Sequence, residues 1–378
     1  MQALIAAYVR TPFHFAAKGA LAQVRPDTLA AQAVRGLLQR ADFDPAGLED
    51  VILGCAYPEG PQGSNLARIV GFLAGLPQQV GGMTINRFCG SSMSAIHMAA
   101  AQIEAGIGEA YLCVGVESMS MVPQGGFNAS PSPDLLRDYP DAYVSMGQTA
   151  ENVARRYQVS RQDQERMALA SHHKAAEARA QGRLAGEIVP VVRDDGERIE
   201  ADGCIRPQTS LEALAALRPA FGPEGVVTAG TASPLTDGAA VVLVATEAFV
   251  ARHRLQPLAR IRAMATIGCD PAEMGMGPVY ATRKVLARAA LSVRQLDVVE
   301  INEAFASQAL ACIRELDLDP GTVNLDGGAM ALGHPLGATG ARISGKAASL
   351  LARQQGRYAL ATQCIGGGQG IATVLEAL

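Results

Sequence analysis

The sequence predicts an α/β fold in which a sheet carries helices on both faces, and two observations point to it. First, apolar runs at 3–9, 50–57 and 110–118 alternate with stretches of helical periodicity. Nearly continuous apolar strands between helices are typical of a sheet that is buried on both faces. Second, the chain has 378 residues, 49% of them hydrophobic and 18% charged, which is enough to build a large core and more than one domain.

The first third of the chain supplies one set of elements in order. A helix is expected at 27–41 between the first two strands, and a short strand at 81–85. A helix rich in small residues then follows at 91–106, directly before the strand at 110–118. This order predicts one α/β half.

Beyond Ser118 the composition changes. The chain becomes rich in Pro, Gly, Ser and Asp, a charged helix is expected at 161–182, and 187–207 reads as a hairpin. The α/β alternation resumes around 230–247 and continues to the last strand. In this last part, a helix at 337–354 precedes a strand and a glycine turn, much as 91–106 precedes its strand. That likeness is consistent with a duplicated half, although it is too faint to establish one.

Composition excludes several function classes. The net charge is −4 with scattered basic residues, aromatic residues make up 4% and tryptophan is absent, so a nucleic-acid or anionic-membrane partner is not expected. No apolar run approaches ~18 residues and the start of the chain lacks a signal-peptide pattern, so no membrane span or leader is expected. Seven cysteines without a CxxC pair indicate reduced thiols and a cytoplasmic location.

Cys89, in the stretch NRFCGSS, lies where a short strand should turn into a helix. Most free cysteines are small buried hydrophobes. Here the helix N-terminus is expected to lower the pKa of the thiol, and Gly90 to let a substrate approach the backbone. Both a packed cysteine and a nucleophile therefore fit this position.

Two further stretches offer partners for such a thiol. His334 is surrounded by glycines in NLDGGAMALGHPLGATGAR, and an imidazole is the usual group that activates a thiol. Cys364 ends a strand before the glycines of CIGGGQG; no helix follows them, which excludes a dinucleotide fingerprint. A glycine turn with exposed N–H groups suits an oxyanion site, and a plain β-turn is the alternative.

The stretch EINEAFASQ follows a buried strand and carries Asn302, Glu303 and Phe305. The end of a strand is where α/β proteins often place functional groups. A helix cap by Asn302 is the alternative. His172 and His173 are expected on the exposed face of the charged helix. The acidic stretch 193–202 is typical of a solvated turn rather than a metal site. The HExxH, GxSxG and P-loop motifs are absent from the sequence, so a zinc protease, an α/β-hydrolase and an NTPase are not indicated.

Six motifs together resemble the thiolases, in the order and at the spacing of that family, and the match covers essentially the whole chain. They are NRFCGSSMSA, TAGTASPLTDGAA, MGMGP, NEAFA, GGAMALGHPLGATGAR and CIGGGQG. The resemblance implies a thiolase-like duplicated α-β-α-β-α layered fold with an inserted loop domain. It places the N-terminal half at 1–118 and 238–257, the CoA-binding loop domain at 119–237, and the C-terminal half at 258–378.

The same resemblance implies a two-step acyl transfer. Cys89 would take the acyl group, His334 would be its base, and Cys364 would be the second acid and base. One oxyanion hole would combine His334 with a water held by Asn302, and the other the backbone N–H groups of Cys89 and Gly366. No metal or redox cofactor is implied, and coenzyme A enters as a substrate.

Positions that match the family's coenzyme A contacts are expected to bind the substrate. They are Met146, Arg206, Ala213, Phe221, Ala229, Ser233, Ala304 and Phe305.

Within the family, four features look like the degradative branch: NRFCGSSM, IRPQTSLEALAALRPAF, Ser145 and Thr231. Two others, CIGGGQG and AENVARRY, are closer to biosynthetic members. We therefore expect a 3-ketoacyl-CoA thiolase of fatty acid β-oxidation, with a biosynthetic acetoacetyl-CoA thiolase as the alternative. A non-catalytic acyl-CoA-binding relative would not need two thiols and a base. A homodimer or homotetramer is expected, and a subunit of a β-oxidation complex is compatible with the same sequence.

Overall fold

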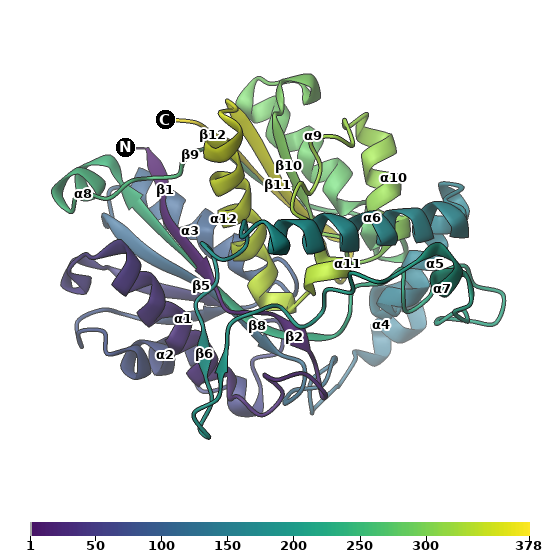
Figure 1. Ribbon diagram of the computed structural model, residues 1–378, viewed down its shortest axis with the longest axis horizontal. Coiled ribbons are helices and arrows are strands. Elements are labelled where there is room, and N and C mark those ends of the chain that lie inside the picture. The colour runs from purple at the N-terminus through teal and green to yellow at the C-terminus, as the bar shows by residue number, and fades with distance from the viewer. Residues whose placement is uncertain (1) are drawn as a thin grey trace.

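The computed structural model describes residues 2–378 and contains one large mixed sheet, with helices packed in layers around it (Figure 1). The strand order is β10-β11-β12-β9-β1-β8-β5-β3-β4, with β2 paired to β8. The strands are β1 (Ala3–Arg10), β2 (His14–Phe15), β3 (Asp50–Gly54), β4 (Met83–Ile85), β5 (Ala110–Ser118), β8 (Thr236–Thr246), β9 (Ala259–Gly268), β10 (Val298–Ile301), β11 (Tyr358–Ile365) and β12 (Gln369–Glu376). The helices of the two halves are α1 (Pro26–Ala41), α2 (Leu66–Ala74), α3 (Ser91–Glu104), α8 (Glu247–Arg252), α9 (Gly277–Ala289), α10 (Ala306–Leu316), α11 (Ala329–Leu332) and α12 (Leu336–Gln354).

The sheet consists of two halves with the same internal order. In the first half β3 is parallel to β5, β5 antiparallel to β8, and β8 antiparallel to β1. In the second half β10 is parallel to β11, β11 antiparallel to β12, and β12 antiparallel to β9. Even the edge strand has a counterpart, because Val323 bridges Val299 in parallel, as β4 pairs with β3. The predicted duplication is confirmed.

Three apolar clusters define the layers. In the first, α1 and α2 cover the outer face of the first half-sheet. In the second, residues of α3 and α12 pack against the inner faces of both half-sheets. In the third, α9 and α10 cover the outer face of the second half-sheet. The predicted α-β-α-β-α layering is therefore present, and α3 and α12 form its central layer.

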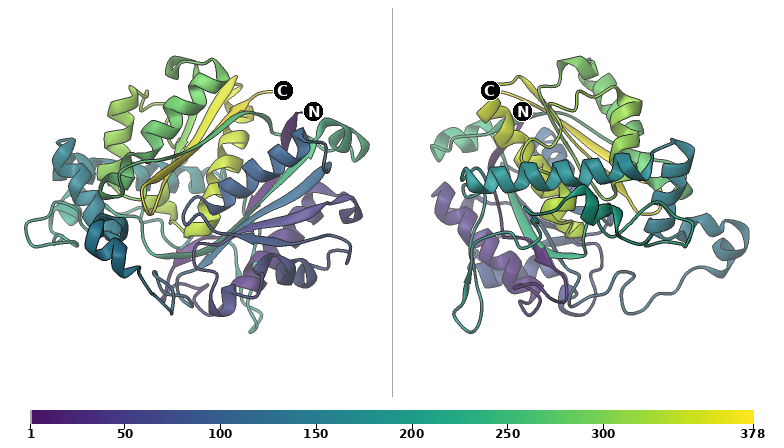
Figure 2. Two further views of the ribbon diagram at one scale, coloured as in Figure 1. Left: turned by 180° about the vertical axis from the view of Figure 1, so that it is seen from behind. Right: turned by 45° about the vertical axis from the view of Figure 1, so that its right-hand side comes forward.

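The segment between β5 and β8 folds over this framework. It contains α4 (Pro133–Asp138), α5 (Met146–Arg156), α6 (Arg161–Ala180), the hairpin strands β6 (Val191–Val192) and β7 (Arg198–Ile199), and α7 (Leu211–Ala215). Its small apolar clusters include residues of α10 and α11, so it shares its core with the second half. In Figure 1 α6 crosses over α11, and in the right-hand view of Figure 2 the part around α4, in blue, extends away from the layers. Strand β8 begins at Thr236, two residues before the predicted boundary at 238.

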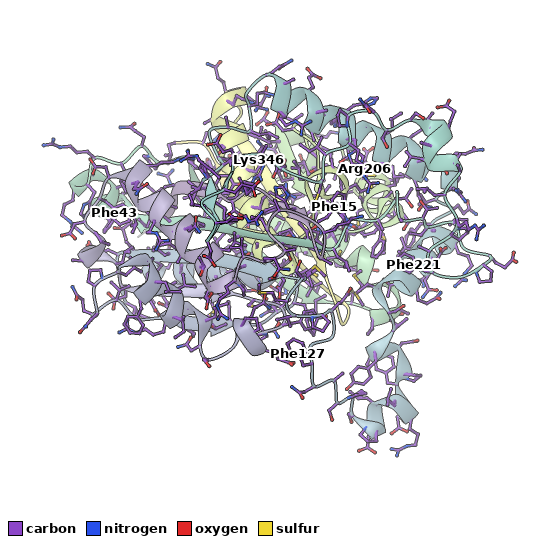
Figure 3. The ribbon with its side chains drawn as sticks, turned by 60° about the horizontal axis from the view of Figure 1, so that its bottom comes forward. Phe15, Phe43, Phe127, Arg206, Phe221 and Lys346 are labelled. Carbon is purple, nitrogen blue, oxygen red and sulfur yellow. The ribbon has the colours of Figure 1, made fainter. Side chains whose placement is uncertain are left out.

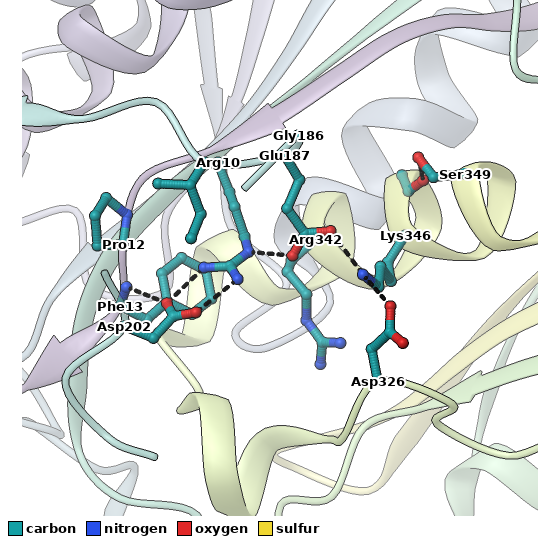
Figure 4. Close-up of polar contacts among 12 residues, drawn as sticks. Arg10, Pro12, Phe13, Gly186, Glu187, Asp202, Asp326, Arg342, Lys346 and Ser349 are labelled. Atoms are coloured by element: carbon teal, nitrogen blue, oxygen red, sulfur yellow. Dashed lines mark hydrogen bonds and ion pairs between the residues drawn. The ribbon is translucent and has the colours of Figure 1, made fainter. Parts of the chain in front are cut away.

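Helix α12 brings a polar stripe into the central layer. Lys346 is 3% exposed and pairs with Glu187 at 2.9 Å and Asp326 at 2.7 Å. Glu187 also pairs with the buried Arg10, which continues the row to Asp202 (Figure 4). Each charge is matched by an opposite one, as buried charges require.

Candidate active site

Cys89 lies in a tight turn between β4 and α3, as predicted. Phe88, directly before it, has a φ of 43°, in the left-handed region that non-glycine residues rarely adopt. The Ser91 hydroxyl accepts from the backbone N–H of Arg87 at 2.8 Å, which closes the turn. A Cβ at Gly90 would overlap the Ile365 side chain, so β11 approaches the turn closely. The strained residue is thus held by the packing around it, a feature common at functional sites.

The pKa of the Cys89 thiol is raised to about 12, and burial is the largest cause. The backbone N–H of Gly366 acts the other way by favouring the thiolate, while the Glu117 carboxylate disfavours it. The expectation that a helix N-terminus lowers this pKa is wrong here, because the desolvation of the thiolate outweighs the helix. Cys89 is therefore protonated at neutral pH and needs a base.

His334, just before α12, is a buried imidazole in the protonation state that such a base requires. Its side chain is 5% exposed, and burial together with Arg342 lowers its pKa to about 3, so the ring is neutral. Nδ1 lies 2.6 Å from the Thr339 hydroxyl, which itself donates to the Pro335 carbonyl at 3.3 Å. We infer from this network that Nδ1 carries the proton, which leaves the Nε2 lone pair free to accept one.

Asn302 lies on the Nε2 side of that ring. Its Nδ2 is 3.3 Å from His334 Nε2, and its side chain is fully buried. The alternative that Asn302 caps a helix is wrong, because α10 begins at Ala306 with Phe305 in the N-cap position. Glu303 has a structural role: its carboxylate accepts from Ser171, Asn324 and the Met330 backbone.

Cys364 lies one residue before the end of β11, with its side chain 1% exposed. Burial raises the pKa of this thiol well above its usual value, and the neighbouring Cys89 raises it further. Gly366, Gly367 and Gly368 form the turn into β12, and Gly366 directs its N–H at the Cys89 sulfur. The glycines thus form a hairpin turn that also supplies the predicted N–H donor. All seven cysteines are free thiols.

Five of the eight predicted coenzyme A positions gather beside Cys364. Met146, Ala304 and Phe305 pack in one apolar cluster with it. The Phe221 and Phe305 rings meet edge to face at 5.8 Å, and the Ser233 N–H donates to the Ala304 carbonyl at 2.9 Å. This cluster gives an apolar wall next to the second thiol.

The other three positions, Arg206, Ala213 and Ala229, lie on the surface of the loop segment. The Arg206 guanidinium lies over the Phe15 ring at 5.1 Å, away from Phe221 (Figure 3). The Arg206 N–H donates to Nδ1 of His172 at 3.1 Å. The expectation that His172 is exposed is wrong, because α6 is covered by the second half and this side chain is only 5% exposed.

Glu117, at the end of β5, is a site residue that sequence reasoning missed. Its buried carboxylate accepts from the backbone N–H groups of Ala56 at 2.8 Å and Gly337 at 2.9 Å, and from Gln62 at 2.9 Å. It therefore ties the first half to the start of α12, next to His334. A charged residue at the end of the otherwise apolar run AYLCVGVES was the available signal.

Residues 2–378 hold neither a candidate membrane span nor a candidate metal cluster. None of their helices is both long and apolar enough to cross a membrane. Over the same range, no group of three or more His, Cys, Asp or Glu side chains is arranged to hold a metal ion.

Comparisons with known proteins show the family of the chain. Residues 3–248 match the thiolase N-terminal domain and residues 255–377 the thiolase C-terminal domain. The chain is 46% identical over 384 residues to a 3-ketoacyl-CoA thiolase of Shewanella sp. (strain MR-7), covering 99% of both chains. It is also 46% identical to a protein of the same name from Saccharophagus degradans, covering 99% of this chain and 97% of the relative. With both domains and the full length matched, this chain belongs to the thiolase family of acyltransferases.

Proposed function

We propose that this chain is a 3-ketoacyl-CoA thiolase, which uses coenzyme A to cleave a 3-oxoacyl-CoA into acetyl-CoA and a shortened acyl-CoA. The observation that carries the proposal is a pair of neighbouring thiols, together with a buried neutral imidazole that contacts Asn302. Cys89 raises the pKa of the Cys364 thiol, the Gly366 N–H faces the Cys89 sulfur, and Asn302 contacts His334. The full-length relatives bear the same activity in their names.

In the first step His334 Nε2 takes the proton of Cys89 as the sulfur attacks the 3-keto carbon. The bond between C2 and C3 then breaks, and its electron pair passes into the thioester enolate. The thiol of Cys364 protonates C2, which releases acetyl-CoA and leaves the acyl group on Cys89. A thiol can give and take this proton because its intrinsic pKa of about 8.5 lies within reach of neutrality.

In the second step the Cys364 thiolate takes the proton of the incoming coenzyme A thiol. The coenzyme A sulfur attacks the acyl group, and the Cys89 sulfur leaves and recovers its proton from His334. The negative oxygens are stabilised by His334 with a water held by Asn302 and by the N–H groups of Cys89 and Gly366. Such donors are worth about 3–4 kcal/mol each in a dry site.

We further infer that the physiological direction is degradative and that no resident metal or redox cofactor takes part. Ser145 supports the branch: it is the N-cap of α5 and its hydroxyl accepts from Gln148, so no imidazole stands before Met146. A cytoplasmic homo-oligomer, alone or with a β-oxidation partner subunit, is the assembly we propose.

Thiolysis rates on 3-oxoacyl-CoAs of different chain lengths test this function. We expect comparable or higher kcat/KM on C8 to C16 substrates than on acetoacetyl-CoA. A steep fall beyond four carbons would instead identify a short-chain, condensing thiolase.

A further inference from the structure

A closed group of polar side chains lies behind the base, between β10 and α12. Asn302 contacts His334 at 3.3 Å, and His334 contacts Thr339 at 2.6 Å. One helical turn beyond Thr339, Arg342 Nη1 donates to Glu300 Oε2 at 2.7 Å. Glu300 lies in β10 and Asn302 directly follows that strand, with its N–H donating to the Thr362 carbonyl at 3.0 Å. In such an extended backbone the two side chains point to the same face.

Several polar atoms of this group have no partner within residues 2–378. They are Asn302 Oδ1, Glu300 Oε1, Arg342 Nε and Arg342 Nη2, and the Tyr8 hydroxyl, which packs on the same helix at Gly345. The Arg342 and Glu300 side chains are 1% and 0% exposed, so bulk water does not satisfy them. Buried polar groups are otherwise almost always hydrogen-bonded, and each exception calls for a physical explanation.

The unpartnered atoms are complementary. Arg342 offers N–H donors at two nitrogens, while Asn302 and Glu300 each offer an accepting oxygen. Burial raises the pKa of the Glu300 carboxyl to about 7 and outweighs the attraction of Arg342 and Lys346. The Arg342 contact therefore pairs one oxygen of this carboxyl and leaves the other, Oε1, without a hydrogen bond. Arg342 also lies close enough to His334 to lower the pKa of its ring. Unpartnered donors and acceptors that are buried on neighbouring residues are the setting in which internal water bridges them.

We propose that Arg342 is a positioning residue for the active site: through bridging water it holds the Oδ1 side of the Asn302 carboxamide. Nδ2 is then directed at His334 and the reacting oxygen. An amide has two similar ends, and only its partners determine which end faces the substrate. Figure 4 shows the Arg342 guanidinium turned away from the neighbouring Arg10–Glu187–Lys346–Asp326 row, with no contact drawn to it.

The alternative is that Arg342 only neutralises Glu300. The two roles differ in what they require: neutralisation needs one positive charge, whereas positioning needs the remaining guanidinium donors. Lysine supplies the positive charge but lacks the planar set of N–H donors of a guanidinium. Arg342→Lys is therefore expected to keep the stability of the fold while losing most of the activity that depends on Asn302.

A double-mutant cycle tests the inference, which rests on the proposed thiolase activity. Three enzymes are compared with wild type: Asn302→Ala, the paired Glu300→Gln/Arg342→Met, and their combination. If Arg342 acts through Asn302, the pair lowers kcat at least tenfold with little change in KM, and the combination is no slower than Asn302→Ala. If the pair does not fold, Arg342→Lys takes its place in the cycle.

Lys346→Met is the matched control, because Lys346 is the next buried charge on the same face of α12. Its partners Glu187 and Asp326 keep other cations, Arg10 and Arg353. It should lower the melting temperature, leave kcat within about twofold, and combine multiplicatively with Asn302→Ala.

Losses that multiply in the Arg342 cycle, or full activity of Arg342→Lys, would overturn the positioning role while leaving the thiolase function intact. A wild-type enzyme inactive on every 3-oxoacyl-CoA would overturn the proposed function and this inference with it.

Discussion

At the scale of single residues, the nucleophile and its base are both uncharged before the reaction begins. Cys89 is a thiol and His334 an imidazole at neutral pH, because the packing that shields them penalises both charged forms. Charge then appears only as the reaction proceeds, next to N–H donors that are already in place. Preorganisation of this kind lowers the barrier without reorganising solvent.

The first prediction is that acylation of Cys89 does not depend on pH over the neutral range. The pKa of His334 is lowered to about 3 and that of Cys89 raised to about 12, so neither group changes its charge between those values. Single-turnover rates at saturating acetyl-CoA should vary less than about threefold from pH 5.5 to 9. A limb of unit slope centred near pH 6.5, as for an exposed histidine, would refute the neutral-base assignment.

The second prediction concerns Asn302. Replacing it with alanine removes one oxyanion donor but leaves Cys89, His334 and Cys364 in place. We expect kcat to fall by about 10²–10³-fold rather than to zero. Steady-state thiolysis measures this, and a loss below tenfold would remove Asn302 from the oxyanion hole.

The residue scale also marks what the sequence could predict about the site. The sequence points to Cys89, His334 and Cys364 through neighbouring glycines, which allow the backbone to approach a ligand or another segment closely. It points to Asn302 through its place directly after a buried strand. The pKa of Cys89 was misjudged, because desolvation depends on packing that no local motif encodes. Glu117 was missed for the same reason: its donors lie far from it in the chain, within residues 55–62 and at Gly337.

At the scale of elements, the close contact between α3 and α12 places the nucleophile and the base. Cys89 precedes α3 and His334 precedes α12, so a shift of one helix against the other separates them. Gly340 makes this contact possible, since a Cβ there would overlap the backbone nitrogen of Met93. No side-chain rotation can relieve an overlap with backbone.

The third prediction follows from that contact. Gly340→Ala should destabilise the fold by about 1–3 kcal/mol, although alanine is the better helix former, and should reduce kcat. Chemical unfolding measures the change. Gly186→Ala is the control, because its Cβ would meet nothing within 4 Å and its φ is not left-handed. Equal stability of the two variants would show that the helices can move apart freely.

At the scale of the whole molecule, the fold class was predictable because the strand-and-helix alternation is local. The duplication was only suggested by sequence, and it became clear from the matching strand registers of the two halves. The buried charges of α12 and the burial of His172 were not foreseen. A charged helix normally faces water, and only the fold shows that α6 and α12 lie under other segments.

The fourth prediction is a loss of stability in mild acid. Burial lowers the pKa of His97 to about 3, His172 to about 4 and His334 to about 3. Because these folded-state values lie below the unfolded value, their stabilisation is complete above pH ~6.5 and is lost as pH falls toward 4. Each group contributes a slope of up to about 1.4 kcal/mol per pH unit.

Urea unfolding at pH 7.5, 6 and 5 measures this loss. His172→Gln should make the dependence shallower, whereas His173→Gln, at the exposed neighbouring position, should leave it unchanged. A stability that stays constant from pH 7.5 to 5 would contradict the burial of these histidines as neutral rings.

The central claim is that Cys89 carries the acyl group and Cys364 moves the proton. The most direct test is peptide mass spectrometry of the enzyme after incubation with labelled acetyl-CoA. We predict one acetyl group on Cys89 in the wild type and in Cys364→Ala, although Cys364→Ala no longer cleaves 3-oxoacyl-CoA. Acetyl on Cys364, or no label in Cys364→Ala, would contradict the division of roles between the two thiols.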